Sequence, residues 1–152
     1  MKSKDIFSNN NIFINKDVKS KDEILVDISS HLLNFNYISN SEGFLNDILD
    51  RESRGSTYIY NYLAIPHGLS KYVIKSKIVI YKTLNPIEWG DGNKVKLIIL
   101  FAIKNEDIDE TEKITIKEFS TLLAEETFKD YLLMCNDKVN IMELINKALN
   151  LC

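Results

Sequence analysis

The feature that most constrains the fold is an apolar run near the middle of the chain, Val95 to Ile103, which contains LIILFAI at positions 97–103. The run is far too short to cross a bilayer as a helix, which takes about 20 apolar residues. Its length and its β-branched residues are typical of a buried strand. We therefore expect this segment to be the most buried strand of a sheet.

Further extended segments are predicted around this run. Gly90-Asp91-Gly92-Asn93 is a hairpin-type breaker, and Asn85-Pro86 predicts a turn. Upstream, residues 78–81 predict a further strand, and the segment 57–65 is rich in Tyr and Ile, which favours extended structure. Residues 12–14 are a candidate for a short edge strand.

Helical periodicity precedes and follows these strands. Ser20 and Glu23 have capping-box spacing, and the apolar residues behind them predict a helix over about 21–36. A second helix is predicted from Ser41 to a natural stop at Gly55. After an acidic loop at 105–111, apolar spacing indicates three more helices, near 114–123, 128–134 and 141–151. The expected fold is α/β (α+β), a mixed β-sheet flanked by helices on both faces.

Composition narrows the class of protein. A chain of 152 residues with 45% hydrophobic content can bury a core without disulfides or metal, so we expect one domain over 1–152. A net charge of -3 without a basic stripe predicts no direct nucleic-acid partner. The N-terminus lacks a signal-peptide core, which favours a cytoplasmic protein without membrane insertion. Cys135 and Cys152 are not spaced as metal ligands, and two reduced thiols are expected.

One of the two histidines lies in LAIPHG, residues 63–68. Pro66 fixes its own φ and biases Ile65 towards extended geometry, while Gly68 removes bulk after the imidazole. The other histidine, His31, lies on the first predicted helix and is interpreted as a boundary residue. For His67 the alternatives are a core imidazole, a metal ligand and a nucleophile.

The sequence lacks the motifs that would supply catalytic partners for His67. No cluster of His, Cys, Asp and Glu at ligand spacing surrounds it, so we predict no metal. No GxSxG, GxxxxGK[ST] or GxGxxG occurs, which argues against a serine hydrolase and against either nucleotide loop. A neutral imidazole can itself take a phosphoryl group near pH 7. Chemistry alone leaves the core and nucleophile readings about equal.

The residues before His67 follow a longer pattern, RExxxSTxxxNxxAIPHG. The matching positions are Arg51-Glu52, Ser56-Thr57, Asn61 and Ala64 to Gly68, followed by Pro86-Ile87 and Trp89. In these positions the chain, from about 7 to 149, resembles the enzyme IIA domain of the mannitol/fructose class of the bacterial phosphoenolpyruvate-dependent sugar phosphotransferase system. The resemblance implies a mixed sheet flanked by helices.

The resemblance also implies a function and a site. His67 would accept a phosphoryl group from the phosphohistidine of the small carrier HPr and pass it to a IIB domain, without a cofactor. Arg51 matches the family arginine beside the active histidine; the alternative is a cation at a helix C-terminus. Ser56, Thr57 and Asn61 would support the phosphate site, although Ser56 and Thr57 could instead only start a strand. We expect His67 to be exposed at a sheet edge or strand end, near Arg51.

The chain departs from the family pattern in two places. Tyr58, Tyr60 and Tyr62 occupy positions where family members usually have glycines. Many members also carry a second histidine near the start of the helix after the long strand, where this chain has Glu112 or Lys113. From the second departure we expect poor onward transfer of the phosphoryl group.

The stretch WGDGNKVKLIILFAIKNED resembles IIA-like domains at the ends of sugar-operon transcription regulators. Two hypotheses therefore stay open. The first is a phosphocarrier in sugar uptake. The second is a regulatory module of a transcription regulator or antiterminator, phosphorylated or docked as a signal, with the regulator's other domains as partners.

Overall fold

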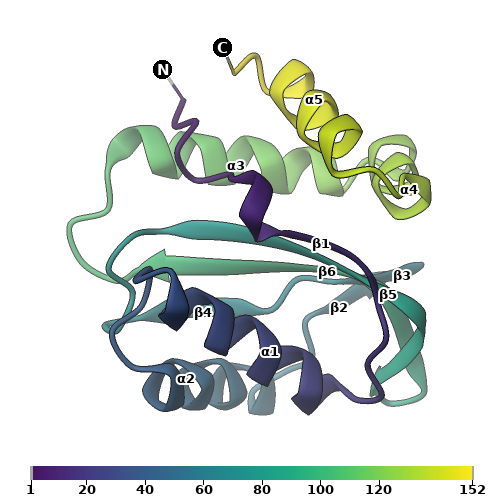
Figure 1. The fold of residues 1–152 in the computed structure, drawn as a ribbon, viewed down its shortest axis with the longest axis horizontal. Helices are drawn as coiled ribbons and strands as arrows, with labels where there is room; N and C mark the ends of the chain where they lie inside the picture. The colour runs from purple at the N-terminus through teal and green to yellow at the C-terminus, as the bar shows by residue number, and fades with distance from the viewer. Residues whose placement is uncertain (1, 152) are drawn as a thin grey trace.

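The computed structural model describes residues 2–151, so Cys152 lies outside the described residues. Its helices are η1 (Asn9–Asn11), α1 (Lys21–Asn34), α2 (Ser41–Ser53), α3 (Glu110–Leu123), α4 (Glu126–Met134) and α5 (Lys138–Ala148). Its strands are β1 (Ile12–Lys16), β2 (Tyr58–Tyr60), β3 (Tyr62–Ala64), β4 (His67–Ser70), β5 (Lys77–Gly90) and β6 (Asn93–Lys104). Figure 1 shows the sheet between two helical layers, α1 and α2 on one face and α3, α4 and α5 on the other. The predicted fold class is confirmed.

The sheet is mixed and centred on β6. Its strand order is β1-β5-β6-β3-β2, and β4 pairs with β6 beyond the end of β3. β5 and β6 are antiparallel, whereas β1 runs parallel to β5, and β3 and β4 run parallel to β6. From Val95 to Ala102 every residue of β6 except Lys96 is buried. The predicted buried strand is confirmed, and so is the short edge strand β1, but β6 is not the most buried strand, because β5 is buried without a break from Lys77 to Thr83.

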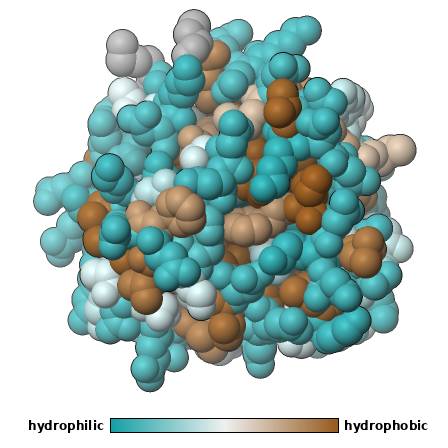
Figure 2. Space-filling view, in the orientation of Figure 1, coloured by the Kyte–Doolittle hydropathy of each residue, from teal (hydrophilic) through white to brown (hydrophobic). Residues whose placement is uncertain are grey.

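Each face of the sheet has its own core. Ile98, Leu100 and Ala102 of β6 pack with the buried residues of α1 and α2. Leu97 and Phe101 alternate with them and pack with the buried residues of α3, α4 and α5. The opposite-face alternation of a strand explains why a continuous apolar run is needed here. On the molecular face of Figure 2 hydrophobic residues form small, separate groups among hydrophilic ones.

The predicted hairpin is confirmed, but the predicted turn at Asn85-Pro86 is wrong. Gly90 pairs with Asn93 across a two-residue turn, in which Asp91 and Gly92 have φ of 54° and 79°. Two positive φ values give the turn the twist that suits a hairpin. At Asn85-Pro86, in contrast, β5 continues with a shift of register between Lys82 and Ile87. Proline lacks an N–H group, and an irregular stretch of strand accommodates this loss.

Segment 57–65 is extended, as predicted, but it forms two strands instead of one. Asn61 and Tyr62 have φ of 39° and 70°, which turn the chain between β2 and β3. The first helix has half of the predicted capping box. Ser20 accepts a hydrogen bond from Glu23 N, while the Glu23 carboxylate accepts from Lys19 N. The third helix begins earlier than predicted, inside the acidic loop, because Asp109 and Glu112 form a complete capping box.

Candidate functional site

His67 begins β4, where a strand restarts after a proline. β3 and β4 run in the same direction along β6, with Ala64 paired to Ile98 and His67 to Phe101. Between them Pro66 has no N–H to donate, but its carbonyl still accepts a hydrogen bond from Phe101 N at 3.1 Å. The interruption at Pro66 thus puts His67 at a strand end while keeping the backbone attached to β6.

Gly68 lets α2 approach β4 closely. A Cβ at this position would lie 2.6 Å from Cζ of Phe44 and 3.2 Å from the carbonyl oxygen of Phe101. Phe44 is fully buried on α2, so its ring has little room to move. Ser70, two residues on, donates to Asp47 Oδ2 at 2.6 Å. These contacts hold the α2 face of β4, and the alternation of the strand directs His67 and Leu69 away from α2.

The imidazole of His67 is exposed, as predicted, and its ring is supported by Phe101. The two ring planes are parallel within 1°, with centroids 6.2 Å apart. Partial burial lowers the pKa of His67, the positive charge of Arg51 lowers it further, and the charge of Glu52 opposes both. The ring therefore favours its neutral form at neutral pH, the form that has a free nitrogen lone pair.

Arg51 lies in the last turn of α2 and acts electrostatically on His67. Its Nη1 donates to the carbonyl of Gly55 at 2.8 Å, which ties the guanidinium to the chain that follows the helix. A guanidinium has five N–H donors, so most of them remain for another acceptor. Arg51 therefore fits both interpretations made from the sequence: it is a cation at the C-terminal end of a helix, and its charge acts on the neighbouring His67.

A buried network behind Arg51 was not predicted from the sequence. The Glu52 side chain is 4% exposed; it accepts from Lys21 Nζ at 2.8 Å and from the hydroxyl of Thr57. Trp89 Nε1 donates to Thr57 Oγ1 at 3.4 Å, and Lys21 Nζ lies 4.7 Å from the centre of the Trp89 ring. Glu52 and Trp89 belong to the family pattern, but the pattern does not indicate that Thr57 and Lys21 join them in one network.

The structure brings Thr57 near His67, but not Asn61. The Thr57 carbonyl accepts from Ile65 N at 3.0 Å, two residues before His67. Asn61 lies at the other end of β3, next to Tyr62, which pairs with Val95. His67 pairs with Phe101, six residues further along β6, or about 20 Å at the rise of a strand. The Asn61 carbonyl accepts instead from Lys129 Nζ at 3.2 Å.

Ser56 is exposed next to Thr57. Its Oγ accepts a hydrogen bond from Tyr58 N at 3.1 Å. This contact is the strand-start role that was the alternative for Ser56, and it leaves the hydroxyl proton for another acceptor.

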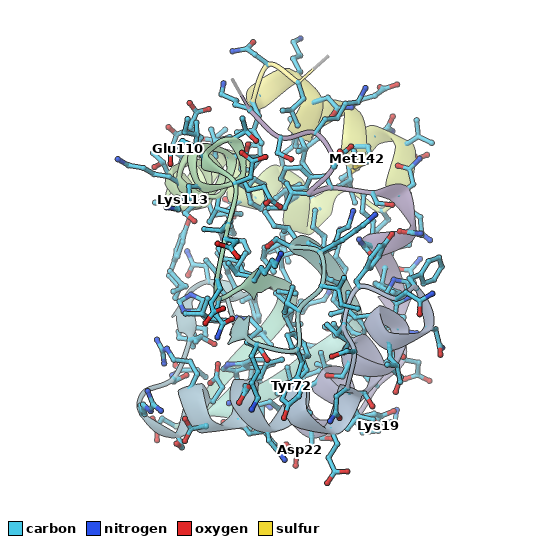
Figure 3. All side chains as sticks on the ribbon, turned by 90° about the vertical axis from the view of Figure 1, so that its left-hand side faces the viewer. Lys19, Asp22, Tyr72, Glu110, Lys113 and Met142 are labelled. Carbon is cyan, nitrogen blue, oxygen red and sulfur yellow. The ribbon has the colours of Figure 1, made fainter. Side chains whose placement is uncertain are left out.

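The positions in place of the second histidine lie at the start of α3 (Figure 3). Glu112 Oε1 accepts from Asp109 N at 3.4 Å in the capping box, and Nζ of the exposed Lys113 lies 4.0 Å from Glu110 Oε2. Glu112 borders the same pocket as Lys104, three residues beyond Phe101 on β6, or about 10 Å at the rise of a strand. Glu112 and Lys113 are not among the charges that shift the pKa of His67, which are those of Arg51 and Glu52 on α2.

Two of the three tyrosines have packing roles. Tyr58 is partly buried against the core under α1 and α2, and the Tyr60 hydroxyl donates to the carbonyl of Leu123 at 3.1 Å. Tyr62 is 45% exposed. The bulk that replaces the family glycines is therefore largely directed into the fold.

Within residues 2–151 no group of three or more His, Cys, Asp and Glu side chains is arranged to hold a metal ion. In the same part of the chain no helix has the length and apolar character to cross a membrane.

The chain matches a family model and several known proteins. The model described as "Phosphoenolpyruvate-dependent sugar phosphotransferase system, EIIA 2" matches residues 5–148. The mannitol-specific phosphotransferase enzyme IIA component of Geobacillus stearothermophilus is 31% identical over 141 residues, which are 87% of this chain and 96% of that protein.

Two solved structures share the fold. The nitrogen regulatory protein IIA-Ntr from Neisseria meningitidis has a TM-score of 0.79 at 18% identity, covering 93% of this chain and 97% of that one. Enzyme IIAMTL in its complex with phosphorylated enzyme IIBMTL from Escherichia coli has a TM-score of 0.75 at 23% identity, with coverages of 93% and 99%. Since the family model spans nearly the whole chain, this protein belongs to the EIIA 2 family of the phosphoenolpyruvate-dependent sugar phosphotransferase system.

Proposed function

We propose that this chain is a phosphoryl carrier that accepts a phosphoryl group on His67 from phospho-HPr and passes it to a IIB domain of a sugar transporter. The observation that carries this function is the exposed, neutral-favouring imidazole at the start of β4, held by Phe101 and lying within the field of Arg51. A core histidine would be covered and would need polar partners.

The transfer balances without an additional reactant. The lone pair of the unprotonated His67 nitrogen forms an N–P bond while the N–P bond of the donor phosphohistidine breaks, and the donor nitrogen keeps the bonding pair. Such transfers depend mainly on alignment and on stabilising charge on the equatorial oxygens. Phe101 and the strand end align the ring, and the free guanidinium donors of Arg51 stabilise those oxygens.

Thr57 and Glu52 support this site indirectly. The bonds from Lys21 and Thr57 hold the Glu52 carboxylate, and Glu52 is the immediate neighbour of Arg51 on α2. We assign Asn61 no part in the phosphate site, because the register of β3 and β4 separates it from His67.

The relatives support the carrier role: the Geobacillus protein is named as an enzyme IIA component, and the Escherichia coli enzyme IIAMTL was solved with a phosphorylated IIB partner. The regulatory alternative is favoured by the absence of a histidine at Glu112 or Lys113 and by the resemblance of WGDGNKVKLIILFAIKNED to regulator-linked IIA-like domains. The two differ in whether the phosphoryl group must leave again for a IIB domain.

One experiment tests the site and separates the two roles. The protein is incubated with labelled phosphoenolpyruvate, enzyme I and HPr, and the label is then chased with IIB domains of several sugar classes. We expect label on the wild type, none on His67→Ala, and transfer to one IIB that is slow because the second histidine is missing. Label retained on His67→Ala refutes the site. Label on the wild type that no IIB removes refutes the carrier and leaves the regulatory module.

A further inference from the structure

Lys82 of β5 is a buried cation without an acidic partner. The residue is 3% exposed. Its Nζ donates to the carbonyl of Cys135 and, at 3.1 Å, to Asn136 Oδ1, both on the segment after α4. Among residues 2–151 no ion pair joins this ammonium to a carboxylate. An ammonium has three N–H donors, so one remains for a further acceptor.

Burial of a cation in this way is unfavourable. Desolvation is the largest cause that lowers the pKa of Lys82, to about 8, and the nearby charge of Lys96 acts in the same direction, against an opposing contribution from Cys135. An unpaired buried charge costs stability, and proteins usually pair it or use it. Lys82 is nevertheless buried, and a second positive group, Lys96, lies near it.

Lys82 and Lys96 line an open pocket of about 590 Å³ that contains no aspartate or glutamate. A second pocket lined by lysines differs in this respect, because Asp5, Asp107, Asp109 and Glu112 line it as well. The excess of positive charge is thus a property of the Lys82 pocket and not of the whole surface, since the chain carries a net charge of -3.

The same pocket has an apolar side that water now contacts. Met134 is 79% exposed, Leu84 is 50% exposed and Tyr62 is 45% exposed. The volume lies within the range of pockets that bind small molecules, about 300–1,000 Å³. A ligand with a charged head and a short apolar body would satisfy the lysines and cover these side chains together.

We propose that this pocket binds a small organic anion, with its carboxylate or phosphate head on Lys82 and Lys96 and a short apolar body against Leu84 and Met134. The pocket is separate from His67. Lys82 pairs with Leu97, whereas His67 pairs with Phe101, four residues away or about 13 Å along β6.

Three probes test this pocket in the full chain by amide chemical-shift titration: hexanoate, hexyl phosphate and inorganic phosphate, with hexanol as the uncharged control. We expect shifts around Lys82 and Met134 with hexanoate or hexyl phosphate, weaker binding of inorganic phosphate, and none of hexanol. The tighter binder of hexanoate and hexyl phosphate identifies the head group. His67→Ala should bind as the wild type does.

Variants give the decisive comparison. Lys82→Met should weaken binding of the charged probes by at least about tenfold, because a hydrogen bond to a charged group is lost. Met134→Ser, at an exposed position, should weaken hexanoate but not inorganic phosphate. Lys94→Gln, on β6 two residues before Lys96 and outside the pocket lining, is the matched control and should change nothing.

Three results would overturn the assignment. The first is equal binding of hexanol and hexanoate, and the second is unchanged affinity in a Lys82→Met protein that shows a folded spectrum. The third is no shift with any of the three probes; shifts with an acidic peptide titrated in the same way would then make the pocket a protein-docking site. If Lys82→Met failed to fold, the Lys96→Gln and Met134→Ser titrations would decide, and unchanged affinity in both would refute the pocket.

Discussion

The two faces of the sheet, one covered by α1 and α2 and the other by α4, treat buried charge differently. Near His67, the buried Glu52 carboxylate is matched by Lys21 and by the hydroxyl of Thr57. In the Lys82 pocket, a buried ammonium has only neutral acceptors and a second lysine beside it. Lys129, on the same face of the sheet as Lys82, shows that this is not forced by the fold, because it lies 2.5 Å from Asp130.

This comparison distinguishes buried charges that stabilise the fold from a buried charge that is available to bind a ligand. A matched pair such as Lys21–Glu52 costs stability when one partner is removed, whereas an unmatched cation can cost stability while it is present. The His67 region therefore uses its buried charges to hold an exposed group in place. The Lys82 pocket keeps its charge unneutralised, as a binding group would be.

The largest effect is expected from Arg51→Gln. Removing the guanidinium should lower the rate of phosphoryl transfer to His67 about 10²–10³-fold, because donors aimed at developing charge contribute that much to catalysis. Arg51→Lys should recover part of the rate, since a point charge remains without the bidentate fork. Rapid-quench measurement with phospho-HPr gives both values. A wild-type rate in Arg51→Gln would leave the arginine only its helix-end role.

The second effect is on stability, from Lys21→Met. It leaves the Glu52 carboxylate with the Thr57 hydroxyl but no cation, and we expect a loss of about 2–3 kcal/mol of unfolding free energy, below the full value for a buried pair because Lys21 is 22% exposed. Urea denaturation at pH 7 measures it. The double variant Lys21→Met, Glu52→Gln should recover part of the loss; no recovery would mean that the cost lies in packing against Trp89.

The same substitution at Lys82 should act in the opposite direction. We expect Lys82→Met to stabilise the protein by about 1–2 kcal/mol at pH 7, because it removes an unmatched buried charge. The pKa of Lys82 is lowered to about 8, so between pH 8 and 10.5 the unfolded chain binds more protons and wild-type stability rises with pH. The advantage of the variant should therefore shrink by pH 9.5. A destabilised variant at both pH values would contradict the contrast between the two lysines.

The smallest effect concerns the pH profile of His67. Burial and Arg51 lower the pKa of His67, so the neutral form that accepts the phosphoryl group persists to lower pH than for an ordinary histidine. The rate should therefore decline only below the ordinary histidine pKa of about 6.5. Arg51→Gln removes one of the two lowering causes, so its decline should begin at higher pH. Histidine signals followed by NMR titration measure both pKa values. Identical curves would show that Arg51 does not act on the ring.

Much of the fold and part of the site could be predicted from the sequence. The apolar run of β6, the Asp91-Gly92 turn and the Ser20 cap are local patterns with local causes, and each was confirmed. His67 and Arg51 were found through the spacing of the family pattern, and the structure places their charges within each other's influence.

What could not be predicted depends on contacts between distant segments. Lys21, the segment with Glu52 and Thr57, and Trp89 are three separate parts of the chain, and no spacing indicates that they share one network. The Lys82 pocket was hidden for a related reason. Asn85-Pro86 looked like a turn, which would have left Lys82 near a loop, whereas the continued strand places it under the end of α4.

The two-residue turn between β5 and β6 has a consequence for the order of assembly. Gly90 and Asn93 pair across a loop of two residues, whereas His67 pairs with Phe101, 34 positions further along the chain, at a larger entropic cost of closure. Local pairings tend to form early in folding and distant ones late. We therefore expect the β5–β6 hairpin to nucleate the domain and the region around His67, the proposed phosphoryl acceptor, to be completed last, so that a half-folded chain would not accept phosphoryl groups.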